Sequence, residues 1–294
     1  MNYDVRADNS VHNKMTEYQY ELYKVMQEFH AVCEENNLKY FIIGGTLLGA
    51  IRHKGFIPWD DDIDVAMPRD DYEKLLKLGK QYFSYPYEIE HFSIEVSKDL
   101  APDFYTRLVN REIDVSIEKG DGFHYEKAFI DIFPIDGTPN SKLVRKFFYL
   151  RLLTLRALYK FTVIDEINAG SVGENKRKLA ETLLIKIAQK TRIGKLLNGN
   201  KLREKVEKLL SRYPLERTKC KCGTFHGRYR TKEFVDKMYF NERQLYKFED
   251  SEFWGTRYYD GYLKEIYGNY MQLPPMGKRI SPHRISVITH SKEI

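Results

Sequence analysis

Cysteine is scarce in this sequence and long hydrophobic runs are missing, and each shortage excludes a class of protein. Three cysteines in 294 residues cannot form the disulfide framework of a small secreted domain. No apolar run reaches the roughly 20 residues that a membrane-spanning helix needs, and the polar residues after Met1 do not resemble a signal peptide. We therefore predict a cytoplasmic protein, which would work at the inner face of the cell membrane if its basic segment contacts lipid.

Two of the cysteines stand close to a histidine, which raises a zinc site as an alternative. Cys220, Cys222 and His226 belong to the residue types that bind zinc through sulfur and nitrogen. A fourth ligand is not evident, and the spacing differs from that of a zinc finger. We therefore interpret this segment as an ordinary loop.

Charge is distributed unevenly along the chain. The formal net charge is +6, yet residues 140–232 contain 24 Lys and Arg against 7 Asp and Glu, a net of +17. A segment this basic is expected to lie near polyanions, which leaves a catalytically inactive nucleic-acid-binding protein as an alternative. Because no nucleic-acid-binding module is recognisable, we expect no nucleic acid partner.

A short strand ending in two glycines predicts a ligand-binding turn. Residues 38–43 are aromatic and β-branched, which is typical of a buried strand. Gly44 and Gly45 tolerate positive φ and let a ligand come close to the backbone. Thr46 is a candidate N-cap for a helix that follows, whose first-turn amides would face an anion such as phosphate.

An acidic run follows, and it predicts a metal site. Asp62 and Asp64 are two residues apart, so on a strand both carboxylates would project from one face. Asp131 interrupts an apolar strand, and a buried carboxylate is unfavourable unless it is paired or bound to metal. Oxygen ligands of this kind suit Mg²⁺ or Mn²⁺. A solvated acidic surface and a calcium loop are the alternatives, although Val65 stands where a calcium loop has glycine.

The link between the glycines and the acids is basic and aromatic. Arg52 and Lys54 would neutralise phosphate charge, and Trp59 would line one side of a ligand. A surface loop around a buried tryptophan is the alternative.

Three later helices are expected in the basic segment. Residues 145–161 are apolar over most of the helix surface, with Arg145, Lys146, Arg156 and Lys160 on one side. Such a helix suits an anionic membrane interface, although burial within its own lobe is an equal alternative. Further helices are predicted near residues 174–191 and 201–211.

The glycine turn and the acidic run together resemble the signature of the LicD family. The resemblance covers residues 44–65, from Gly-Gly-Thr-Leu-Leu-Gly to Trp-Asp-Asp-Asp-Ile-Asp-Val, and similar blocks recur at residues 129–137 and 262–275. It implies an α+β, nucleotidyltransferase-like mixed sheet with helices, and a metal-dependent phosphotransferase. Arg107 resembles a basic position of the family that could reach a phosphate, with a surface ion pair as the alternative.

We therefore expect a catalytic core at residues 14–137, a basic helical lobe at 138–232 and a C-terminal segment at 233–294 that closes the site. The resemblance implies transfer of phosphocholine from CDP-choline to a glycan acceptor, which could be lipid-linked. Asp62, Asp64 and Asp131 would be catalytic and would hold the metal. The aromatic C-terminal segment would bind the choline ammonium through Trp254 and Tyr258, since ring faces attract quaternary ammonium groups. Phosphoglycerol or phosphoribitol transfer is the alternative.

Overall fold

The computed structural model of the chain describes residues 15–93, 105–119, 122–162, 190, 193–281 and 283–288. The α-helices are α1 (Glu17–Glu35), α2 (Gly44–Arg52), α3 (Arg69–Tyr82), α4 (Lys142–Thr162), α6 (Gly199–Leu210) and α7 (Tyr259–Tyr267). The 3₁₀ helices are η2 (Ile193–Leu196), η3 (Leu215–Arg217), η4 (Arg230–Glu233), η5 (Lys237–Phe240) and η6 (Met276–Lys278). The strands are β1 (Phe41–Ile42), β2 (Asp64–Pro68), β3 (Tyr87–Glu90), β4 (Thr106–Lys119), β5 (Gly122–Gly137), β6 (Lys221–Gly223), β7 (Phe234–Asp236), β8 (Arg243–Phe248), β9 (Ser251–Thr256) and β10 (Arg284–Ile288).

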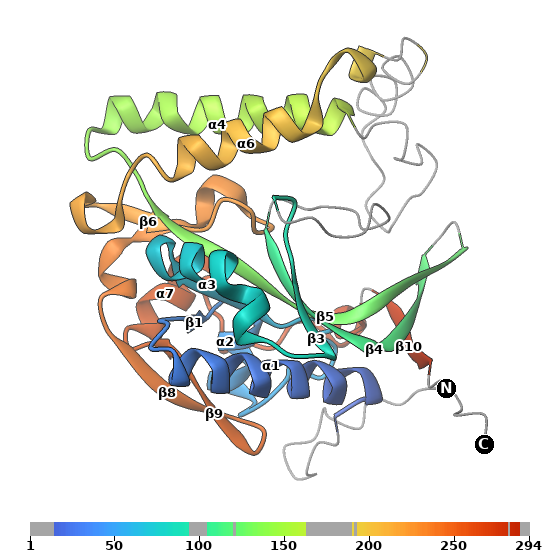
Figure 1. The fold of residues 1–294 in the computed structure, drawn as a ribbon. Coiled ribbons are helices and arrows are strands. Elements are labelled where there is room, and N and C mark those ends of the chain that lie inside the picture. The colour runs from blue at the N-terminus through green and yellow to red at the C-terminus, as the bar shows by residue number, and fades with distance from the viewer. Residues whose placement is uncertain are drawn as a thin grey trace.

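The strands form one mixed sheet in the order β10-β4-β5-β2-β1-β9-β8. β3 pairs with β4, and β6 links β5 to β7. The β2–β5 and β1–β9 pairs are parallel, whereas the neighbouring β1–β2 and β4–β5 pairs are antiparallel. A mixed sheet with helices packed around it confirms the predicted α+β fold class (Figure 1).

Apolar residues at helical spacing predict a helix over about residues 14–37, and the structure confirms it as α1. Thr16 and Gln19 form a capping box, which supplies hydrogen-bond partners to the free amides of the first turn. The buried stripe of the helix includes Leu22, Met26 and Phe29, and it packs against β4, β5 and β10. The apolar spacing in the sequence was therefore a sufficient signal for this helix and for the face that it buries.

Two strand predictions need correction. The near alternation of apolar residues predicts separate strands at residues 104–109 and 113–117. From Thr106 onwards both belong to β4, whose register with β5 shifts between Asn110 and Asp114. The Asp-Gly-Thr-Pro sequence at residues 136–139 predicts a turn in which the Asp136 side chain bonds the backbone. It lies instead within β5, is buried, and pairs with Arg69.

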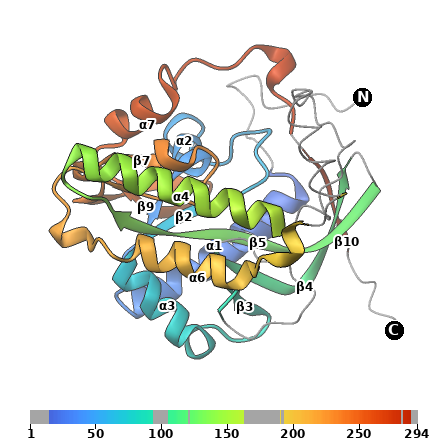
Figure 2. The same cartoon turned by 90° about the horizontal axis from the view of Figure 1, so that it is seen from above.

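The helices α4 and α6 lie side by side above the sheet and share a second hydrophobic cluster (Figures 1 and 2). This cluster includes Phe148, Leu152, Leu202 and Val206. The predicted helices at 145–161 and 201–211 are thus confirmed, while the one near 174–191 falls almost entirely outside the described residues. The boundaries of the three predicted regions remain predictions.

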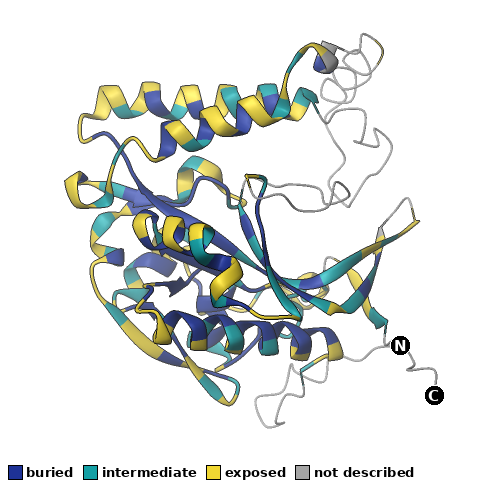
Figure 3. Ribbon diagram, in the orientation of Figure 1, coloured by how far each residue is buried: buried dark blue, intermediate teal, exposed yellow. Residues whose placement is uncertain are grey.

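The outer face of α4 differs from the expected one. Arg145 and Arg156 are half-buried, and Arg145 donates a hydrogen bond to the carbonyl of Pro139 (2.9 Å). Leu143, Phe147 and Leu150 are 65%, 62% and 60% exposed, and their spacing of four and three residues puts them on one face of the helix. Figure 3 shows exposed positions along the length of α4. None of the helices in the described part of the chain combines the length and the apolar composition of a bilayer crossing.

Candidate active site

The Gly44–Gly45 turn brings the start of α2 against two carboxylates. The N–H of Ile43 donates to the carbonyl of Asp64 (3.1 Å), which aligns the end of β1 with β2. Gly44 has a φ of +55°. A Cβ at Gly44 would lie 3.2 Å from Asp64 Oδ2, and one at Gly45 would lie 2.5 Å from Asp60 Oδ2. Because Gly44 and Gly45 have no side chains, the carboxylates of Asp64 and Asp60 can approach the backbone there.

Thr46 does not cap this helix, so that prediction is wrong. The N-cap is Ile43, which places Thr46 inside the first turn of α2. The buried Thr46 hydroxyl accepts a hydrogen bond from the backbone N–H of Asp64 (2.8 Å). Because buried backbone amides need a partner, Thr46 fixes the first residue of β2.

Three neighbouring strands carry charged residues in one row. Asp64 on β2 is in register with Asp131 on β5, and Asp131 is in register with Arg107 on β4. Residues in register on adjacent strands project from the same face of a sheet. Arg107 Nε lies 3.5 Å from Asp131 Oδ1, and its Nη1 lies 3.8 Å from Glu126 Oε2. The sheet thus places Asp131 between Asp64 and a guanidinium group.

Asp62 lies in the loop before β2, so the expected strand-borne pair of Asp62 and Asp64 is wrong. Within the described residues, one group of three potential ligands has its ligand atoms within 4.8 Å of one another, and it consists of Asp60, Asp61 and Asp62. Asp62 belongs both to this group and to the predicted set with Asp64 and Asp131, whose role as metal ligands stays a prediction. All these side chains offer oxygen atoms, which fit a hard divalent cation.

Burial and mutual repulsion raise the pKa values of these acids. Burial raises the pKa of Asp60 and of Asp64 well above the ordinary value, and the Asp62 carboxylate raises both further. Asp62 is exposed as a residue, yet the protein atoms around its carboxyl group and the Asp61 carboxylate also raise its pKa. A cation between the carboxylates would relieve this repulsion, so the acids fit the implied metal ion.

Asp61 contacts residues from the C-terminal part of the chain. Its Oδ2 accepts a hydrogen bond from the Ser281 hydroxyl (2.9 Å) and lies 3.0 Å from His283 Nδ1. The strand β10 follows directly and pairs with β4. Residues more than 200 positions apart in the chain therefore meet at the acidic run.

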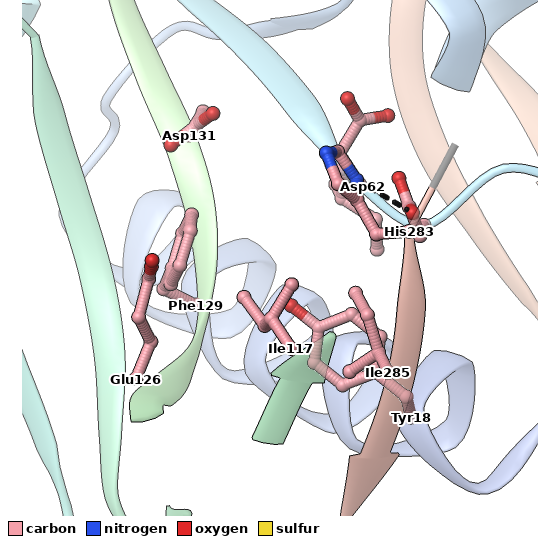
Figure 4. Close-up of a pocket in the computed structure, with 10 residues that line it drawn as sticks. Tyr18, Asp62, Ile117, Glu126, Phe129, Asp131, His283 and Ile285 are labelled. Carbon is pink, nitrogen blue, oxygen red and sulfur yellow. Dashed lines mark hydrogen bonds and ion pairs between the residues drawn. The ribbon is translucent and has the colours of Figure 1, made fainter. Parts of the chain in front are cut away.

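A pocket opens beside the acids (Figure 4). Its volume is about 630 Å³, including the open solvent at its mouth. The carboxylates that line it are Asp61, Asp62, Glu126 and Asp131, and the other lining residues are Tyr18, Ile63, Ile117, Phe129, His283 and Ile285. One end of the pocket is thus acidic, whereas its walls are aromatic and apolar.

Two arginines lie near each other, and one of them, Arg52, interacts electrostatically with Asp60. Arg52 Nη1 donates to the carbonyl of Tyr270 (2.7 Å), and the Arg279 guanidinium lies 6.0 Å from the centre of the Trp59 ring. Burial lowers the pKa of Arg52, as does the charge of Arg279, while Asp60 opposes both effects. The predicted positions Arg52 and Trp59 therefore lie beside the acids.

Three other predicted residues have partners elsewhere. The carbonyl of Lys54 accepts from the N–H of Glu249 at the β8–β9 turn. Trp254 Nε1 donates to Glu34 Oε1 (2.8 Å), and Arg243 lies 4.3 Å from the Trp254 ring centre. The Tyr258 hydroxyl donates to Glu242 Oε1 (2.6 Å). The structure therefore does not assemble the expected ammonium cage from Trp254 and Tyr258.

Several residues of the site were not predicted. Asp60 and Asp61 belong to the same acidic run as Asp62, so the run itself was a signal for them. Tyr267 on α7 lies near Asp64 and Asp60, and its hydroxyl would be 3.7 Å from a Cβ at Gly44. Nothing in the local sequence around Tyr18 or His283 indicates that they meet Asp61.

The zinc alternative receives no support. Cys222 is buried in the main core and Cys220 is exposed. His226 Nε2 lies 3.0 Å from Glu207 Oε1. In the part of the chain that the structure describes, these residues form no compact group of metal ligands.

The strands β1 to β5, the glycine turn and the acidic run all lie within a segment that matches a nucleotidyltransferase domain. Residues 37–150 match the LicD/FKTN/FKRP nucleotidyltransferase domain. The chain is also 30% identical over 270 residues to the lipopolysaccharide cholinephosphotransferase LicD of Haemophilus influenzae. The aligned region covers 89% of this chain and 92% of that protein. This chain belongs to the LicD family.

Two uncharacterized Rickettsia proteins are similar to shorter parts of the chain. The protein of Rickettsia typhi is 35% identical over 145 residues, which is 49% of this chain and 40% of that protein. The protein of Rickettsia prowazekii is 40% identical over 70 residues, which is 24% of this chain and 26% of that protein.

Proposed function

We propose that this protein transfers phosphocholine from CDP-choline to a sugar hydroxyl of a cell-surface glycan and releases CMP. The acceptor would be a precursor of lipopolysaccharide, teichoic acid or capsule. The observation that carries the proposal is the cluster of carboxylates against a glycine turn, in a chain with 30% identity to a lipopolysaccharide cholinephosphotransferase. Transfer of phosphoglycerol or phosphoribitol is the alternative, because the diphosphate chemistry would be the same.

Asp62, Asp64 and Asp131 would hold Mg²⁺ or Mn²⁺, with Asp60 beside them. When bound, such an ion neutralises the diphosphate and favours in-line displacement. Asp131 completes the ligand set or accepts the proton of the acceptor hydroxyl, for which its place next to Asp64 is suitable. The hydroxyl oxygen bonds to the phosphorus that carries choline, and the bond from this phosphorus to the CMP oxygen breaks.

Arg52 and Arg279 would bind the phosphate groups of the donor. Burial lowers the pKa of Arg52, and the nearby charge of Arg279 lowers it further; an anion between the two guanidinium groups would relieve their repulsion. Guanidinium groups also match phosphate oxygens in geometry.

A panel of CDP-alcohols tests the proposed function. The protein is incubated with Mg²⁺, lipopolysaccharide as acceptor, and CDP-choline, CDP-glycerol or CDP-ribitol, and CMP is measured by chromatography. We expect the fastest release from CDP-choline and none after chelation of the metal. Faster release from a polyol donor would contradict the choline assignment, and no release from any donor would contradict phosphotransfer.

We also propose that α4 contacts an anionic membrane surface, where a lipid-linked acceptor would be held. Leu143, Phe147 and Leu150 form an exposed apolar face, and the exposed Lys146 and Arg151 flank it. An apolar face bordered by basic residues is typical of helices that lie in the interface of anionic lipids. The net charge of +17 over residues 140–232 is complementary to such a surface.

A further inference from the structure

The pocket beside the acids contains features that neither metal binding nor phosphate binding requires. Tyr18, Ile117, Phe129 and Ile285 supply aromatic and apolar walls, and Figure 4 shows them gathered below Asp62 and Asp131. They come from α1, β4, β5 and β10. Isoleucine side chains have no atoms that bind a metal ion or a phosphate, so these walls fit a different part of the donor.

The pocket has a strongly negative field. Four carboxylates line it, and the Arg107 guanidinium lies 3.8 Å from Glu126 and 3.9 Å from the centre of the Phe129 ring. The Tyr18 hydroxyl points into the pocket (Figure 4). Burial raises its pKa, and so do Asp61, Asp131, Glu126 and Asp62. Four carboxylates thus face the space, and none of the described residues that line it is a lysine or an arginine.

The walls offer few hydrogen-bond donors. Among the lining residues, the side-chain donors are the Tyr18 hydroxyl and the His283 ring, whose Nδ1 is already 3.0 Å from Asp61. A polyol needs several donors and acceptors, and a site without them discriminates against it. A trimethylammonium group has no hydroxyl and no N–H, and it is held by ring faces, methyl contacts and negative charge.

We propose that this pocket, formed by Tyr18, Ile117, Glu126, Phe129 and Ile285, binds the quaternary ammonium of the donor. The inference rests on the proposed function and specifies which part of the chain selects the headgroup. The phosphate bearing choline lies at Asp62 and Asp131, and the ammonium extends from there toward Glu126. Selection of the donor therefore takes place on the sheet and α1, and not at Trp254 and Tyr258.

The test compares CDP-choline with the CDP ester of 3,3-dimethylbutan-1-ol, in which carbon replaces the choline nitrogen. The two molecules have the same shape and differ in charge. Dissociation constants for both are measured by calorimetry in the presence of Mg²⁺. We expect the wild-type protein to prefer CDP-choline by roughly 2- to 30-fold, the range that corresponds to a cation–π contact.

Ile285→Lys places a cation in the pocket and should abolish this preference. Ser286→Lys is the matched control, because it adds the same charge to β10 but on the exposed, opposite face of the strand. Glu126→Gln removes one negative charge without changing the shape of the side chain, and should lower the preference several-fold. If Ile285→Lys does not fold, the Glu126→Gln variant by itself tests the inference.

The outcomes separate this inference from the proposed function. If wild-type protein releases CMP from CDP-choline but Ile285→Lys and Glu126→Gln keep the wild-type preference, the ammonium lies elsewhere and the inference is wrong. If Ser286→Lys loses the preference as fully as Ile285→Lys, net charge rather than the pocket is responsible, which also overturns it. If no CMP is released by wild-type protein, the proposed function itself fails.

Discussion

Asp64 is positioned through both its backbone and its carboxylate. Its backbone is fixed by Ile43 and Thr46, and its carboxylate lies between the Gly44 turn and Asp131. Burial and nearby carboxylates raise its pKa, so its ionised form is unfavourable until a cation is bound. An ionised Asp64 therefore lowers the stability of the metal-free protein, as we expect of a carboxylate that binds a metal ion.

Asp64→Asn should lower CMP release by roughly 100-fold or more, because it removes charge where the donor diphosphate must be neutralised. The melting temperature of the metal-free protein should stay the same or rise, since a repelled carboxylate is lost. Asp250→Asn, at an exposed position of the β8–β9 turn, is the control and should change neither. Full turnover in Asp64→Asn at saturating donor would contradict the assignment.

His91 provides a pH-dependent contribution to stability that is separate from the site. It is buried, its Nδ1 accepts from the backbone N–H of Ser93 (3.3 Å), and burial lowers its pKa from 6.5 to about 4. Between these two values the unfolded chain binds the proton and the folded protein does not. Stability should therefore fall as the pH falls from about 6.5 to about 4, by on the order of 3 kcal/mol.

Urea unfolding at several pH values between 7 and 4 measures this effect. The variant His91→Gln should show a flatter dependence on pH than wild-type protein over this range. An equal slope for both proteins would mean that another group binds the proton.

Among the elements, α4 has two faces of similar hydrophobicity with different surroundings. Phe148 and Leu152 are buried against α6, whereas Phe147 and Leu150 are exposed. The sequence predicted an apolar helix with basic residues, but could not tell which side packs, because this depends on where α6 lies.

Phe147→Glu combined with Leu150→Glu should abolish sedimentation of the protein with anionic liposomes at low salt, because it removes the apolar contact and adds negative charge. High salt should weaken the binding of wild-type protein as well. The control variant combines Gln244→Glu with Ser286→Glu. It adds the same charge at exposed sites away from α4. Equal recovery of wild-type protein with neutral and anionic liposomes at low salt would contradict the membrane contact.

Across the whole molecule, one buried charge network joins the sheet to the α4–α6 layer. Arg69 on α3 donates from Nε and Nη2 to both carboxylate oxygens of Asp136 on β5 (2.7 and 2.5 Å), and from Nη1 to Glu207 on α6 (2.8 Å). Burial would raise the pKa of Glu207, but Arg69 and His226 outweigh it and lower the value to about 2. The guanidinium group thus pairs with two acids from different layers.

Arg69→Met should destabilise the protein by roughly 3–5 kcal/mol, because it leaves Asp136 buried without its partner. The double variant Arg69→Met, Asp136→Asn should recover part of this loss, since the unpaired charge is removed too. Chemical denaturation of the two variants and wild-type protein measures the difference. If the double variant is no more stable than Arg69→Met alone, the unpaired charge is not the cause.

The first helix of the chain and the gathering of carboxylates at the glycine turn could be predicted from the sequence, because both depend on neighbours a few residues away. The spacing of Leu22, Met26 and Phe29 determined α1 and its buried face. The two glycines and the acidic run Asp60 to Asp64 determined that carboxylates would gather at a turn, which favours a divalent cation and a phosphate-bearing ligand.

Only the tertiary structure decided which distant residues join these acids. The order and register of β2, β5 and β4 align Asp64, Asp131 and Arg107, and the pairing of β10 with β4 brings His283 to Asp61. Trp254, which the sequence favoured for the ammonium, is held by Glu34 and Arg243 instead. Strand pairing joins segments that are far apart in the chain, so no local pattern of residues specifies which side chains meet across it.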